Sequence, residues 1–167
     1  MRIVDKHETA TWLSARGLMD ANGTLSVTGY KTRIPYAIPP DSGRKTALSR
    51  TLASLFGEQQ EALLWINEFG IWPSSEDRHL FAGFRRSLGD QSPLPEKPGH
   101  IFSTDDLDTV GSLLAMVLYF CWGAIVVSGT GGVLVRIVHD EQIHIYARNA
   151  VELSSIHTRL ARVLEQD

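Results

Sequence analysis

The stretch Thr109–Val135, TVGSLLAMVLYFCWGAIVVSGTGGVLV, decides the fold because it runs for 27 residues without Asp, Glu, Lys, Arg or His. A helix of about 20 mainly apolar residues can cross a bilayer. Here Gly123 and the cluster 128–132, SGTGG, interrupt the apolar run, and such glycine clusters are typical of turns. The apolar residues before Gly123 follow helical spacing, whereas those after it form short β-branched runs. The stretch therefore predicts a buried helix over 103–121, in which Cys121 is an inert core thiol, followed by a central hairpin.

The composition is that of an ordinary globular protein. The chain has 167 residues, 43% of them hydrophobic and 21% charged, which predicts one domain over 1–167 with a core that needs no disulfides. A single cysteine excludes an intrachain disulfide, and no secretory signal pattern stands at the start. We therefore expect a cytoplasmic protein that has no membrane association and no cofactor.

Helical and strand-like patterns alternate irregularly along the rest of the chain. Helices are expected over 7–16 and 149–165, around 48–56 and around 80–88, and strands over 25–28, 33–38 and 62–68. Pro35 argues for an edge position of its strand, and 62–68 could also begin as a helix. Because no regular βαβ rhythm is present, the order favours an α+β fold. The expected architecture is an antiparallel sheet of about five strands packed against four to five helices.

A cluster of polar side chains, His139, Asp140, Glu141 and His144, lies where alternation on both sides predicts a hairpin turn. Imidazoles and carboxylates are metal ligands, so His139, Glu141 and His144 could form the centre of a metal-dependent hydrolase. The two histidines are five residues apart, however, and on one continuous strand they would face opposite sides. Asp and Glu are also ordinary turn residues. The metal hydrolase is therefore an alternative hypothesis only.

The leading hypothesis is a non-catalytic binding protein, such as an adaptor or an immunity-type inhibitor, with a protein partner. It rests on the absence of catalytic motifs and on two projections, the Pro-rich loop 90–100 and the 139–142 hairpin. Trp72, followed by Pro73, is the tryptophan most expected to be exposed. The candidate contact residues are Trp72, His100, His139, Asp140 and Glu141.

A basic segment near the N-terminus supports a third, weaker hypothesis. Residues 1–50 carry a net charge of +4, although the whole chain is at −3. Lysines and arginines on one face could bind a phosphate backbone. The residues concerned are Lys31, Arg33, Arg44, Lys45 and Arg50, and the bland alternative is that they are solvated surface residues. The sequence leaves the partner and the oligomeric state open.

Overall fold

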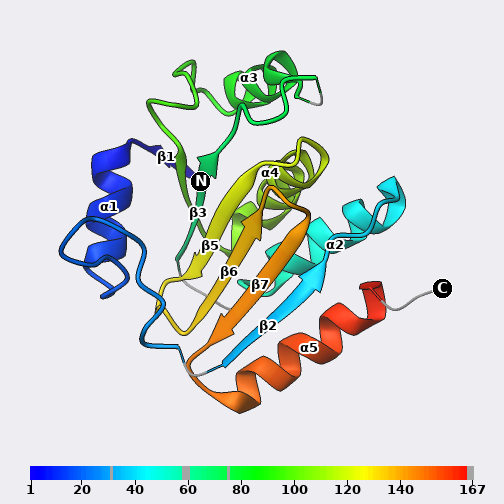
Figure 1. The fold of residues 1–167 in the computed structure, drawn as a ribbon. Coiled ribbons are helices and arrows are strands. Elements are labelled where there is room, and N and C mark those ends of the chain that lie inside the picture. The colour runs from blue at the N-terminus through cyan, green and yellow to red at the C-terminus, as the bar shows by residue number, and fades with distance from the viewer. Residues whose placement is uncertain (31, 58–60, 75, 165–167) are drawn as a thin grey trace.

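One antiparallel sheet of seven strands organises the chain in the computed structural model, which describes residues 1–30, 32–57, 61–74 and 76–164. The strands are β1 (Arg2–Val4), β2 (Thr32–Ala37), β3 (Ala62–Glu68), β4 (Gly99–Phe102), β5 (Gly123–Ser128), β6 (Val133–Val138) and β7 (Gln142–Ala147). Their spatial order is β1-β4-β3-β5-β6-β7-β2 (Figure 1). The predicted α+β class is therefore confirmed, although the sheet is larger than the five strands expected.

The difference in strand number comes from two short strands. β1 and β4 have three and four residues, too few to show a periodic pattern, and they pair with each other at one side of the sheet. The expected strand over 25–28 is wrong, since Leu25 forms only an isolated bridge to Met19. Pro35 lies on β2, which pairs with β7 at the edge of the sheet, as a residue without an N–H requires.

Five α-helices accompany the sheet in the part of the chain that the structure describes. They are α1 (Lys6–Ser14), α2 (Ser42–Ser54), α3 (Arg78–Ser87), α4 (Leu107–Tyr119) and α5 (Ala150–Leu164), with a short 3₁₀ turn at Thr104–Asp106 before α4. The larger of two hydrophobic clusters joins α2, α4 and α5 to one face of the sheet. In Figure 1 this face points away from the viewer, and α2 and α4 lie behind the sheet. Asn149 accepts a hydrogen bond from the backbone of Glu152 and so caps α5, as its sequence predicted.

The segment 109–135 forms the centre of this larger cluster. α4 is shorter than predicted, and no helix among the described residues is long and apolar enough to cross a membrane. The expected central hairpin is confirmed as β5 and β6, joined through the glycine-rich turn. Val110, Leu114 and Val126 are wholly buried, because α4 lies on a strand face that is apolar along its length.

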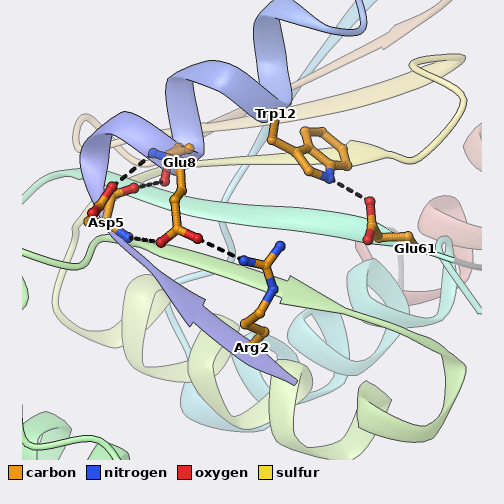
Figure 2. Close-up of polar contacts among 6 residues, drawn as sticks. Arg2, Asp5, Glu8, Trp12 and Glu61 are labelled. Carbon is orange, nitrogen blue, oxygen red and sulfur yellow. Dashed lines mark hydrogen bonds and ion pairs between the residues drawn. The ribbon is translucent and has the colours of Figure 1, made fainter.

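The opposite face is covered by α1 and the loop that follows it. Trp12 and Leu13 pack there against Leu63 and Leu134 in a second hydrophobic cluster. Polar contacts hold α1 in place: Asp5 caps the helix through the Glu8 backbone, and the Trp12 indole N–H donates to Glu61 at 2.6 Å (Figure 2). At β3 and β5 the sheet is thus covered on both faces. This packing holds the ends of these strands in place, next to the polar residues that the sequence predicted as contacts.

Candidate functional site

A shallow hollow of about 300 Å³ brings together most of the predicted contact residues. Its lining consists of Trp72, Cys121, His139, Asp140 and Glu141. The tip between β6 and β7 supplies the last three, so the predicted hairpin turn is confirmed. Trp72 comes from the loop after β3 and is 51% exposed, as predicted, and its neighbour Ile71 is 41% exposed. Residues from three separate segments therefore form one surface.

Glu68 connects this hollow to the sheet, and sequence reasoning missed that role. Its Oε2 lies 3.0 Å from Nδ1 of His139, across 71 residues of chain. The pairing of β3 with β5 is irregular between Ile66 and Glu68, where Glu68 lies opposite Gly123. A Cβ at position 123 would lie 2.7 Å from the Cβ of Glu68, so only glycine leaves room for this carboxylate. This hydrogen bond holds the His139 ring against the end of β3.

Two lining residues have left-handed backbone conformations. Cys121 has φ 52° and Glu141 has φ 62°, and in the described part of the chain no other non-glycine residue has a positive φ. Such conformations cost about 1 kcal/mol or more per residue and are concentrated at functional positions. Cys121 is also half-buried and lies beyond the end of α4, which corrects its predicted place inside the helix and core.

The histidines of the metal hypothesis do not converge. His139 pairs with Glu68, whereas a ring nitrogen of His144 lies 3.2 Å from the side-chain oxygen of Gln142. His144 is nearly buried on β7, where it pairs with Arg136 across the strands. Across the ranges that the structure describes, no group of three His, Cys, Asp or Glu residues could hold a metal ion. The arrangement gives the metal hydrolase no support.

His100 is not a surface residue, which corrects its prediction as a contact. The segment 99–102 does not continue the Pro-rich loop but forms β4, between β1 and β3. The His100 side chain is fully buried and packs edge-on against Phe81, with ring centroids 6.5 Å apart. Burial, and then the nearby charge of Arg85, lowers the pKa of His100 to about 3, so the ring is neutral at pH 7.

The basic segment does not offer an open cationic face. Lys31 lies outside the described residues, as does the side chain of Arg33. Lys45 is buried, with its Nζ 6.0 Å from the centre of the Tyr119 ring. Arg44 pairs with Asp41, whose carboxylate also caps α2. Arg50 alone remains exposed among the three described side chains, and nucleic-acid binding finds no support here.

Comparison with known proteins adds no assignment. No protein-family model, no curated protein and no solved structure matches this chain at a significant level.

Proposed function

We propose that this chain is a non-catalytic binding protein that contacts a protein partner through the hollow at the 139–141 hairpin tip. One observation supports it most: Trp72 and Ile71 are exposed next to a charged turn. Exposed tryptophans are rare on surfaces that contact only water, and they dominate the binding energy of many interfaces. A large apolar side chain beside a polar rim is the usual composition of such a contact.

The charges around the hollow define the chemistry of the partner. Asp140 and Glu141 are exposed at the tip, and the carboxylate of Glu68 lies beside them against the His139 ring. The net potential there is negative, so we propose a partner with lysine or arginine side chains around an apolar one. Electrostatic attraction of this kind mainly accelerates association and excludes acidic partners.

Binding without catalysis accords with the polar groups that are present. The only cysteine is Cys121, and no serine stands in a Gly-x-Ser-x-Gly motif. An adaptor or an immunity-type inhibitor needs a rigid contact surface and no reactive group, and the paired Glu68 and His139 side chains supply rigidity. We further propose a cytoplasmic setting, on the ground that the single cysteine is unpaired.

The test is affinity capture with the purified chain as bait, followed by quantitative binding of each captured protein. The triple variant Trp72→Ala, Asp140→Lys, Glu141→Lys should lose its specific partner, by about 100-fold or more in affinity. Val151→Ser is the matched control, because Val151 is 82% exposed on α5, near the opposite ends of β6 and β7. A partner that binds the triple variant as tightly as the unaltered chain would overturn the proposal.

A further inference from the structure

A second cavity, of about 410 Å³, lies between α3, the loop that follows it and the end of β3. Its apolar lining includes Phe69, Phe81, Trp122 and Leu94. Three guanidinium groups, those of Arg78, Arg85 and Arg86, share the lining with one carboxylate, that of Asp90. The cavity therefore combines an aromatic body with an excess of positive charge, and its size is in the range of small-molecule sites.

Arg85 is the unusual member of this lining. Its side chain is 1% exposed, yet within the described part of the chain only Nη2 has an acceptor, the Asp90 carboxylate. Nε and Nη1 have no hydrogen-bond partner among the described residues. A buried donor left without an acceptor costs about 1–3 kcal/mol, and more when it is charged, so such a group calls for an explanation. An acceptor from outside the chain would provide one if the Arg85 side chain turned toward the cavity, because both atoms are closed off from solvent in this conformation.

The carboxylates nearby are already engaged. Asp90 receives hydrogen bonds from Arg85 and from the Ser92 backbone, and Lys97 lies 3.7 Å away. Burial alone would raise the pKa of Asp90, but these hydrogen bonds hold it below its ordinary value. Glu76 is bound by Arg78 and by the Gly70 backbone. In this arrangement neither carboxylate accepts a hydrogen bond from Nε or Nη1 of Arg85.

We infer that this cavity is a binding site for a small organic anion, whose carboxylate or phosphate head group accepts from Arg85 and whose apolar body packs on Phe81 and Trp122. Arginine suits such head groups because its planar N–H donors match their oxygens. Arg86 lies on the same helix, is exposed at the rim of the cavity, and adds positive charge where the ligand enters. This site is separate from the proposed protein contact, and either assignment can fail without the other.

The experiment is calorimetric titration of the full chain with benzoate and, separately, with phenyl phosphate. Benzyl alcohol is the neutral analogue, and inorganic phosphate is the head group without the apolar body. We expect saturable binding of one benzoate or one phenyl phosphate per chain and at least about tenfold weaker binding of the two partial ligands. The anion that binds more tightly shows whether the site prefers a carboxylate or a phosphate head group. No saturable binding of either one would overturn the inference.

Variants then place the ligand. Arg85→Lys keeps the charge but loses the planar donors and should weaken binding about tenfold or more, whereas Arg86→Gln should weaken it about threefold. Since Arg85→Lys could unfold locally, Ala82→Phe provides a second route by filling the cavity from α3, and it should abolish binding. Arg162→Gln, an exposed arginine on α5, is the control. Binding that survives both Arg85→Lys and Ala82→Phe would show that the anion lies elsewhere.

Discussion

The segment 109–135 and the region around α3 are built in opposite ways. In 109–135, the helix α4 and the strand β5 bury apolar side chains almost without interruption, and their polar groups are mostly backbone groups bonded within helix and sheet. Around α3, the protein instead buries Arg85, His100 and the carboxylate of Glu76 beside Phe81 and Trp122. Apolar burial stabilises a fold directly, whereas burial of charge costs free energy unless each group is paired.

This difference separates the scaffold from the part available for function. A region that stabilises the fold needs no unsatisfied donors, and the side chains of 109–135 fit that description except for the buried indole N–H of Trp122. The α3 region contains a buried cation, Arg85, with N–H donors that have no acceptor, an arrangement that a purely structural role does not require. The comparison therefore predicts that substitutions in the two regions differ in size and in pH dependence.

The largest effect is expected in the apolar region. Leu114→Ala removes a wholly buried side chain of α4 and should lower the free energy of unfolding by about 4 kcal/mol, because the transfer and cavity terms add. Ser112→Ala is the control on the exposed side of the same helix, with an expected change within about 0.5 kcal/mol. Urea denaturation measures both. Equal effects at the two positions would show that α4 does not pack as described.

The next effect concerns the ion pair of the α3 region. Asp90→Asn leaves the buried Arg85 charge without its counter-charge and should cost about 3 kcal/mol in urea denaturation. The double variant Arg85→Met, Asp90→Asn should regain most of that loss, since it leaves neither charge of the pair buried without the other. If the double variant is less stable than the single one, the pair itself stabilises the fold and the contrast between the regions is weaker.

A pH effect is expected from His100. The pKa of His100 is about 3 in the folded chain, against an ordinary value near 6.5. Between these two pH values the unfolded chain binds a proton at His100 that the folded chain does not bind. Stability is therefore fully present above pH 6.5 and is lost as pH falls toward 3, by about 2 kcal/mol between pH 7 and pH 5. His100→Leu should lack this slope whatever its stability at pH 7. An unchanged slope in that variant would assign the titration to another group.

The smallest effect concerns the C-terminal end of α4, inside the apolar region. Cys121 has a left-handed backbone at the end of α4, where the Trp122 N–H donates to the Val117 carbonyl in the pattern that usually has glycine. Cys121→Gly should therefore raise the melting temperature slightly, corresponding to about 0.5–1 kcal/mol. Cys121→Ala is the control, because it removes the thiol and keeps the strained backbone. A stabilising Cys121→Ala would point to the thiol instead.

The sequence predicted the scaffold far better than the sites. The hairpin after Gly123, the turn at Asp140 and Glu141 and the exposure of Trp72 follow from local patterns, and the structure confirms them. β1 and β4 could not be predicted, because short strands depend on pairing with distant segments. For the same reason the burial of His100 was not predicted. Its sequence neighbours suggested a loop, and the side chain is buried only because β4 lies between β1 and β3.

The site partners were hidden for a similar reason. Glu68 lies 71 residues from His139, and no spacing rule joins them. Arg85 stands among other charged residues on α3, and its pattern is that of a solvated helix face. Only the fold places it under the loop that contains Asp90. The glycine at 123 was a usable signal, since a glycine inside a strand pattern often marks a close approach of another group.

The central claim is that the buried charge of Arg85 on α3 binds a ligand. The most direct test follows the indole N–H resonances of the tryptophans during a titration with benzoate or phenyl phosphate. Trp122 lines the α3 cavity, whereas Trp12 donates to Glu61 under α1 and serves as an internal reference. We expect the Trp122 resonance to shift saturably, the Trp12 resonance to stay in place, and Arg85→Lys to suppress the shift. A Trp122 resonance that does not move with either anion, or that moves in parallel with Trp12, would contradict this claim.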